Sequence, residues 1–295
     1  MNEKRNTLMI AAFAKATAIL LLLGLFAPAL AYATTPTEQH KTVQEQSQIS
    51  PDRVQEAQQF YQDSREEFLN ARAHLEDSRT SETIFNLKNA TRIFLHHTID
   101  YTTIRLEIME DRAITAEESD FAPFIISDNI EGYIDQLENM EDDVEAAETR
   151  EEFQAIINGI SNIWQHANLE SRYFILGTAN NRVDSFLERG ESISDRIEAE
   201  IERLANAGED TEKLEQLQDE YNDALQDAKK THEKATMLLN DHTGFDNEGV
   251  LNDAEDARMF LDETNLLMRE THNHLKDGYS VLQEIFDELK HNRPG

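Results

Sequence analysis

The sequence predicts an all-α protein, with an N-terminal four-helix bundle that continues through a long helix into an antiparallel helical coiled coil. Three observations support this fold class. Glycine and proline are scarce, at 10 and 5 in 295 residues, so few positions can form the turns that all-β and Rossmann-type folds need. Apolar residues recur at alternating spacings of three and four along most of the chain, as in amphipathic helices. Helix-capping signals stand where several of these periodic segments begin.

Residues 1–33 have the pattern of a secretory signal peptide. Lys4, Arg5 and Lys15 supply positive charge, and a twelve-residue apolar segment over 16–27 is followed by ALAYA, which contains two small-residue cleavage signals. We expect cleavage between Ala33 and Thr34. The alternative is an uncleaved anchor, but a membrane span needs roughly 20 apolar residues and Lys15 interrupts the run.

The mature chain is expected to begin with a short linker. Residues 34–49 are polar and have no apolar period, so we interpret them as flexible. Helical patterns then follow almost without interruption. We expect a helical bundle over 50–176 and antiparallel coiled-coil helices over 177–291.

The first three helices of the bundle are predicted from their starts and their apolar stripes. The first begins at Ser50-Pro51, a capping hydroxyl followed by a proline suited to the first helical position. The second is expected over about 81–111 and the third over about 122–147. The stripe of the second helix comprises Leu87, Ala90, Phe94, His97, Tyr101, Ile104 and Ile108.

The fourth helix begins at a capping box. In TREE, the Thr149 hydroxyl can accept from the amide three residues on, while Glu152 reaches back. No strong stop follows until NAGED at 206–210. The helix is therefore expected to continue from the bundle into the coiled coil, with weak points for bending at 177–181 and at Gly190.

Two further helices, over about 211–240 and 249–290, show sustained heptads. Many of their core positions hold Ala, Thr or Gly, so we expect close packing. The loop between them, NDHTGFDNEG, carries Asp241, Asp246 and Glu248 without the spacing of an EF-hand, and we interpret it as a solvated connection. The stripe of the earlier helix comprises Leu214, Leu217, Tyr221, Ala224, Ala228, Thr231, Ala235 and Leu238.

Composition excludes several classes of function. The chain has 27 Lys and Arg against 59 Asp and Glu, a net charge of −32, which argues against nucleic acids and anionic membrane surfaces. It has no cysteine, which excludes disulfides, thiolate metal sites, covalent c-type haem, cysteine nucleophiles and a lipoprotein anchor. After the signal segment, no apolar run is long enough to span a membrane.

Three parts of the sequence form a distinctive set: NATRIFLHHTIDYTTIRLEIMEDR, ANLESRYFILG and a Gly-x-Asp-Thr-x-Lys-Leu-Glu turn beginning at Gly208. In these parts the sequence resembles a group of exported, all-helical archaeal proteins of unknown function. The likeness covers roughly residues 55–290. It implies the helical fold, export and a long central helix, and it brings no activity with it.

The paired histidines His96 and His97 are the first candidates for chemistry. They lie about 100° apart on a helix, so they cannot both face one point. His97 falls on the apolar stripe, and Glu170 interrupts the stripe of the fourth helix. Since a buried polar group needs a partner, we hypothesise a structural His97–Glu170 hydrogen bond.

Other candidates are weaker. Asn89 begins the chain's one N-glycosylation sequon, a short pattern of low specificity. His166 and Glu170 have helical ligand spacing, but the Glu-x-x-His motif of carboxylate-bridged dimetal bundles is missing from the sequence. The acidic run from Glu138 to Glu148 is interpreted as a solvated helix face that could bind divalent cations weakly.

These observations predict an exported, non-catalytic protein of the cell envelope or extracellular space. It would act as a scaffold, spacer or interaction module, through an unknown protein partner or self-association of its helices, and without a cofactor. The alternative is a solute- or metal-binding bundle of the sensor type. An apolar cavity with a few convergent polar groups would favour that alternative.

The first prediction concerns processing. The mature protein is expected to begin at Thr34, because the small residues before it match the signal-peptidase pattern. N-terminal sequencing of protein purified from its native cells measures this directly. An intact Met1 would contradict cleavage.

Overall fold

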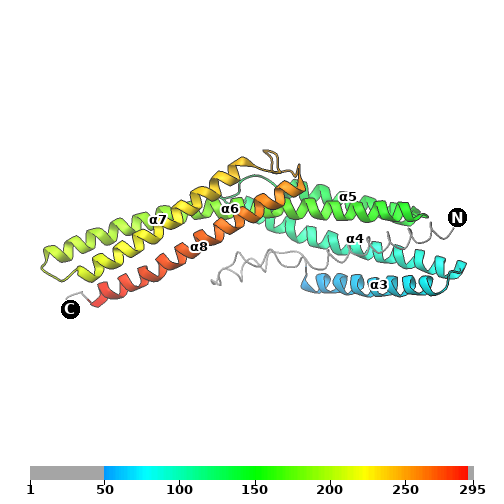
Figure 1. Ribbon diagram of the computed structural model, residues 1–295, viewed down its shortest axis with the longest axis horizontal. Helices are drawn as coiled ribbons and strands as arrows, with labels where there is room; N and C mark the ends of the chain where they lie inside the picture. Colours follow the sequence, from blue (N-terminus) through cyan, green and yellow to red (C-terminus); the bar gives the residue numbers. More distant parts are fainter. Residues whose placement is uncertain (1–49, 292–295) are drawn as a thin grey trace. The chain divides into compact units, whose positions relative to one another are not determined.

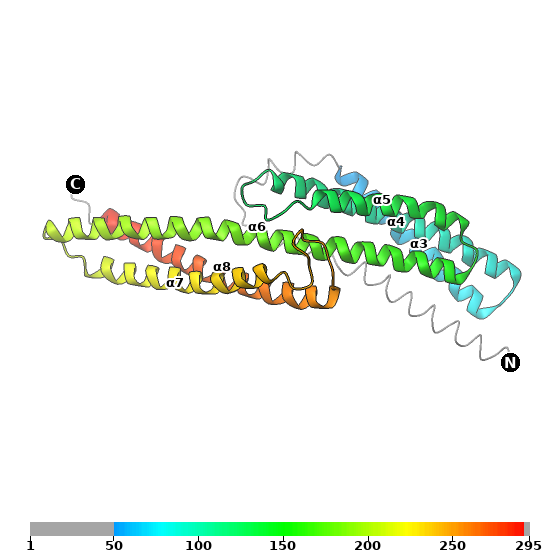
Figure 2. The ribbon, with the colours of Figure 1, turned by 90° about the horizontal axis from the view of Figure 1, so that it is seen from above.

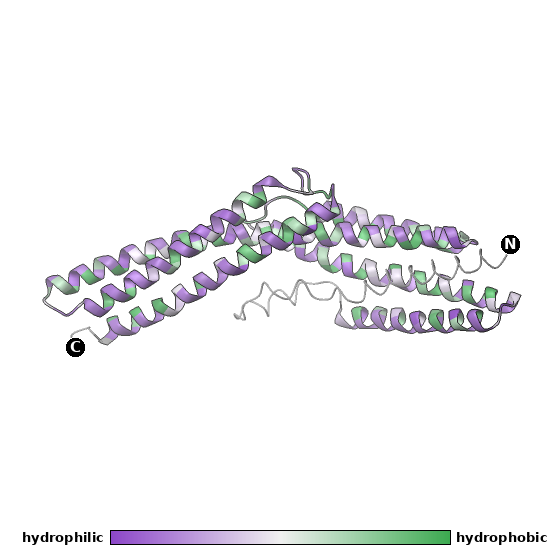
Figure 3. Cartoon of the chain, in the orientation of Figure 1, coloured by the Kyte–Doolittle hydropathy of each residue, from purple (hydrophilic) through white to green (hydrophobic). Residues whose placement is uncertain are grey.

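The computed structural model describes residues 50–291, and the predicted signal segment and the whole predicted linker lie outside this range. The described chain is 86% helical, which confirms the all-α fold class. Figure 1 labels its six helices: α3 (Pro51–Asp77), α4 (Ser81–Glu117), α5 (Ser127–Ala146), α6 (Arg150–Asn206), α7 (Glu212–Asp241) and α8 (Ala254–His291). Along each helix, hydrophilic and hydrophobic residues alternate within single turns, as amphipathic packing requires (Figure 3).

The helices form two compact units. The first contains residues up to Thr115 together with Ile125–Ser171, and the second contains Ala116–Phe124 and the chain from Arg172 onward. Helix α6 contributes to both units, since the division falls between Ser171 and Arg172.

Local capping signals set the starts of two helices as the sequence predicts. Ser50 Oγ accepts from the amide of Asp52 at 3.1 Å, with Pro51 in the first turn. At the start of α6, Glu152 N donates to Thr149 Oγ1 at 3.3 Å, and Glu152 Oε2 accepts from Thr149 N at 2.8 Å. This reciprocal pair satisfies amides that a helix start otherwise leaves unpaired.

Helix α4 lies between α3 and α5 in the first unit. Its aromatic contacts go to α3, with Phe94 against Tyr61 and Phe68 at 5.6 and 5.5 Å between ring centroids. Its charged contacts go to α5 and the turn after it, where Arg92 donates to the carbonyl of Ala147 at 2.6 Å. Because α4 has neighbours on two sides, it buries more than the single predicted stripe.

The buried face of α4 therefore differs from the prediction. Leu87, Phe94 and Ile104 of the predicted stripe are buried, but His97 and Tyr101 remain partly exposed. The added buried positions are Leu95, Ile99, Leu106, Met109, Ala113 and three threonines, Thr91, Thr98 and Thr102. Each of these threonine hydroxyls donates to the carbonyl four residues earlier, at 2.6–2.7 Å, which lets a polar side chain be buried in a helix.

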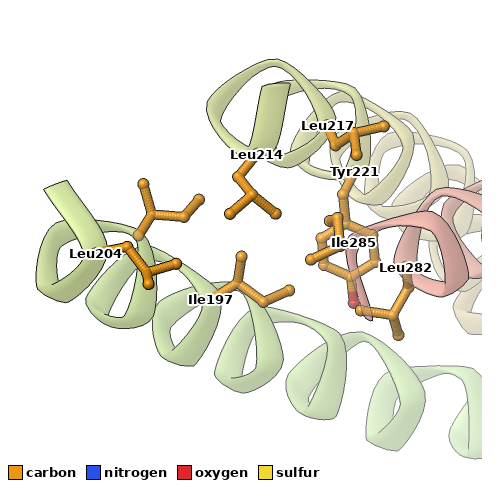
Figure 4. Close-up of a cluster of buried hydrophobic side chains, with 8 residues drawn as sticks. Ile197, Leu204, Leu214, Leu217, Tyr221, Leu282 and Ile285 are labelled. Atoms are coloured by element: carbon orange, nitrogen blue, oxygen red, sulfur yellow. The ribbon is translucent and has the colours of Figure 1, made fainter. Parts of the chain in front are cut away.

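The second unit is built from the later part of α6 together with α7 and α8 (Figure 2). Pairs along α6 and α7 run in opposite directions: Tyr221 Oη donates to the carbonyl of Gly190, while His232 lies at the carbonyl of Asn180. Figure 4 shows one core cluster of this unit, with side chains from all three helices. Its buried members are Ile197, Ile201, Leu204, Leu214, Leu217, Tyr221, Leu282 and Ile285.

Small residues bring α7 and α8 close together. A Cβ added at Gly278 would lie 3.4 Å from Cβ of Ala224, and Thr271 Oγ1 donates to Thr231 Oγ1 at 3.0 Å across the pair. This agrees with the close packing expected from Ala, Thr and Gly at core positions.

The connection between α7 and α8 is not the solvated loop that the sequence suggested. Phe245 and Leu251 within it are only 6% and 7% exposed, and Phe245 stacks on Tyr173 at 4.5 Å. Asp246 Oδ1 accepts from the amides of Glu248 and Val250, each at 2.9 Å. Asp246 thus stabilises the loop's backbone through hydrogen bonds to its amides. Helix α8 begins at Ala254, later than predicted.

The second prediction tests this folded loop with two glycines of positive φ. A Cβ at Gly244 (φ 85°) would lie 2.4 Å from the amide nitrogen of Ala257, whereas Gly208 (φ 83°) has open space around it. We expect Gly208→Ala to cost about 1 kcal/mol for its backbone conformation alone. Gly244→Ala should cost about 1–3 kcal/mol more because it also overpacks. Urea denaturation of both variants measures the difference, and equal losses would contradict the steric argument.

Candidate functional site

A groove in the first unit is the candidate site, with a cavity volume of about 350 Å³. It is lined by α3, α4 and α5. Helix α4 presents His97, Asp100, Ile104 and Glu107 to it, at spacings of three and four that place them on one helix face. The helical period itself therefore lines up these chemically different side chains.

Carboxylates dominate the lining of the groove. Glu56 comes from α3, Asp100 and Glu107 from α4, and Glu138 and Glu141 from α5. Arg53 of α3 is the arginine of the lining, and its guanidinium lies 2.8 Å from a Glu107 oxygen. This ion pair neutralises one carboxylate, so the groove as a whole is strongly negative.

The pairing of α4 with α5 explains why these acids meet. At one end, His96 Nε2 lies 2.9 Å from Glu145, and Lys88 and Arg92 bind Glu148 at 2.8 and 2.7 Å. These hydrogen bonds lower the pKa of Glu148. The two helices run antiparallel there, since residues earlier in α4 meet residues later in α5.

If the antiparallel register of α4 and α5 is continued along the two helices, acidic residues of α4 come level with acidic residues of α5. Asp100 then lies level with Glu141, and Glu110 lies level with Glu131. Partial burial raises the pKa of Glu110, and the nearby charges of Glu131, Asp111 and Glu107 raise it further. At one end of the α4–α5 contact, basic side chains of α4 therefore meet acidic ones. At the other end, acidic side chains of both helices face each other.

His97 lies in the groove and not against Glu170. Its ring stacks on Phe60 of α3, with centroids 5.5 Å apart and planes at 25°. Its Nδ1 is buried and has no hydrogen-bond partner among the described residues.

Glu170 is bound elsewhere. It is fully buried and accepts from Tyr133 Oη at 2.7 Å and from Asn129 Nδ2 at 3.3 Å. Burial, together with this hydrogen bond, raises the pKa of Tyr133.

The predicted His97–Glu170 hydrogen bond is therefore wrong. The buried residues Leu95 and Ile99 each lie two positions from His97, about 200° round the helix. His97 consequently points to α3, while the partners of Glu170 come from α5. The requirement that a buried Glu170 has polar partners holds, but the partners are different.

The remaining predicted positions lie apart from the groove's centre. Asn89 is inside α4 and partly buried, and the cleavage position at Ala33 and Thr34 is outside the described residues.

The sequence analysis did not predict one buried histidine. His232 of α7 is 3% exposed, with Nε2 at 3.1 Å from the Asn180 carbonyl and Nδ1 at 3.4 Å from Asp184. The predicted stripe used Thr231 and Leu238, whereas the buried positions are His232 and Leu239. Both spacings fit a heptad, so only the polar partners on α6 reveal the shift.

Comparison with known proteins gives no match to any family model, curated protein or solved structure. Within residues 50–291, no group of three or more His, Asp or Glu side chains is arranged to hold a metal ion. A search of the described helices finds none with the length and apolarity of a membrane span.

The third prediction tests the raised pKa of Glu110, which burial causes first and the neighbouring carboxylates increase. Because its pKa is raised in the folded state, its ionisation costs stability once the pH is above that value. Glu110→Gln should therefore raise the melting temperature at pH 7. The gain should disappear below about pH 4, where the carboxyl is protonated in both states.

The control for this prediction is Glu66→Gln, at an exposed position of α3 in the same unit. It removes one negative charge without touching the α4–α5 contact. Scanning calorimetry at several pH values compares the two variants. An equal gain in the control, or a gain that persists at acid pH, would contradict the predicted cost of ionising Glu110 in the folded state.

Proposed function

We propose that this protein is an exported, non-catalytic helical protein of the cell envelope or extracellular space that acts as an interaction module or scaffold. The proposal rests on one observation: the buried ionisable side chains bind groups of neighbouring helices. Glu170 binds Tyr133 and Asn129 of α5, and His232 lies between groups of α6. These side chains hold helices together, which leaves the helix surfaces for function.

The continuity of α6 also supports a scaffold role. One helix of 57 residues supplies buried side chains to both units, including Ile160 and Ala167 in the first and Ile197 and Ile201 in the second. Two surfaces are thereby carried on a single secondary-structure element.

A second candidate is a solute- or metal-binding bundle of the sensor type, and the groove of about 350 Å³ favours it. Its volume is in the range of small-molecule sites. The lining, however, is rich in carboxylates, whereas such sites are mostly apolar with a few polar groups. We therefore prefer the interaction module.

The fourth prediction separates these two functions. Native mass spectrometry of the protein purified from its own cells should show the chain in complex with protein. A stoichiometric small molecule or metal ion, retained through purification, would instead support the sensor. The same protein after denaturation and refolding is the control, because it has lost any ligand acquired in the cell.

A further inference from the structure

The acidic groove of the first unit has the features of a surface that receives a helix. Phe60 on its α3 side is 49% exposed, although it is a large apolar side chain that stacks on His97. The groove thus combines one exposed aromatic side chain with carboxylates from three helices.

The charges of the groove are not balanced from within the unit. At the other end of the same α4–α5 contact, Lys88, Arg92 and His96 face the acids of α5 and the turn after it. In the groove, Asp100 stands level with Glu141, and the one arginine of the lining is bound to Glu107. A cationic group on another molecule would complement this negative charge.

The spacing of the carboxylates identifies the kind of molecule. Asp100 and Glu107 are two helical turns apart, roughly 10 Å along the axis, and Glu138 and Glu141 are one turn apart on the neighbouring helix. A single small ion cannot span the two helical turns that separate Asp100 from Glu107. A helix that carries Lys or Arg at spacings of three and four residues places its charges at the same intervals as the carboxylates on α4 and α5.

We propose that this groove binds a basic amphipathic helical segment of a protein partner. The segment lies along α4 between α3 and α5, with its cationic side chains at Asp100, Glu138 and Glu141. Its apolar side chains cover Phe60, as in other helix-in-groove interactions. This inference rests on the proposed role as an interaction module and names the partner's chemistry.

The test uses the mature chain, residues 34–295, and a synthetic 18-residue amphipathic helix of leucine and lysine as the probe. Fluorescence anisotropy measures its binding at about 0.1 M salt, where exposed charges still attract. The variant Glu138→Gln/Glu141→Gln changes two exposed side chains of α5. It should weaken binding roughly fivefold, as expected for losing two exposed ion pairs.

The matched control is Glu198→Gln/Glu202→Gln, which removes the same charge from exposed positions of α6 in the second unit. It should change the affinity less than about twofold, because these residues belong to the second unit and do not line the groove. Phe60→Ala should also weaken the probe, and it should not affect a scrambled peptide of equal charge that lacks an apolar face.

Three outcomes would overturn the proposal. Equal weakening by the control pair would mean that only the overall charge attracts the peptide. Equal binding of the scrambled peptide would show that the groove does not recognise an amphipathic helix. Competition by spermidine or calcium at concentrations comparable with the probe would assign the groove to small cations. If native complexes exist but the probe ignores the groove, this inference fails while the proposed function stands.

Discussion

The rest of the structure depends on one constraint, which is that both units build their cores on the same unbroken helix. Where the first unit gives way to the second, α6 is buried on nearly every side. Glu170 turns to Tyr133 and Asn129 in the first unit, and Tyr173 and Phe174 turn to Phe124 in the second. A helix apolar on one stripe only could not serve two sets of neighbours in this way.

The ends of α6 were predictable because they are local. The capping box at Thr149 and Glu152 needs only contacts three residues apart. At the other end, Gly208 takes a positive φ, and the amide of Glu209 donates to the carbonyl of Leu204 at 3.1 Å. That is the bond pattern of a Schellman motif, which glycine at this position favours. Sequence alone therefore sets the length of the longest helix.

The features that escaped prediction depend on how helices are rotated against one another. His97 was assigned to the core because it sits at a core spacing, but the face it occupies lies against α3 and is only partly covered. Phe245 was assigned to a solvated loop because its neighbours are polar, but a cluster with Tyr173 and Phe260 buries it. In both cases a distant partner decides the environment, and no periodicity contains that information. The groove could be predicted only as an acidic helix face, since its three walls come from separate helices.

Fold stability does not explain the charges of the groove. The α4–α5 contact accommodates lysine, arginine and histidine opposite its acids at one end, so the same packing tolerates cations. Further along the same contact and outside the groove lining, burial and the charges of Glu131, Asp111 and Glu107 raise the pKa of Glu110. Helix packing therefore does not require acids on both sides of the contact. The groove's carboxylates and the exposed ring of Phe60 are the features that the proposed basic helix would contact.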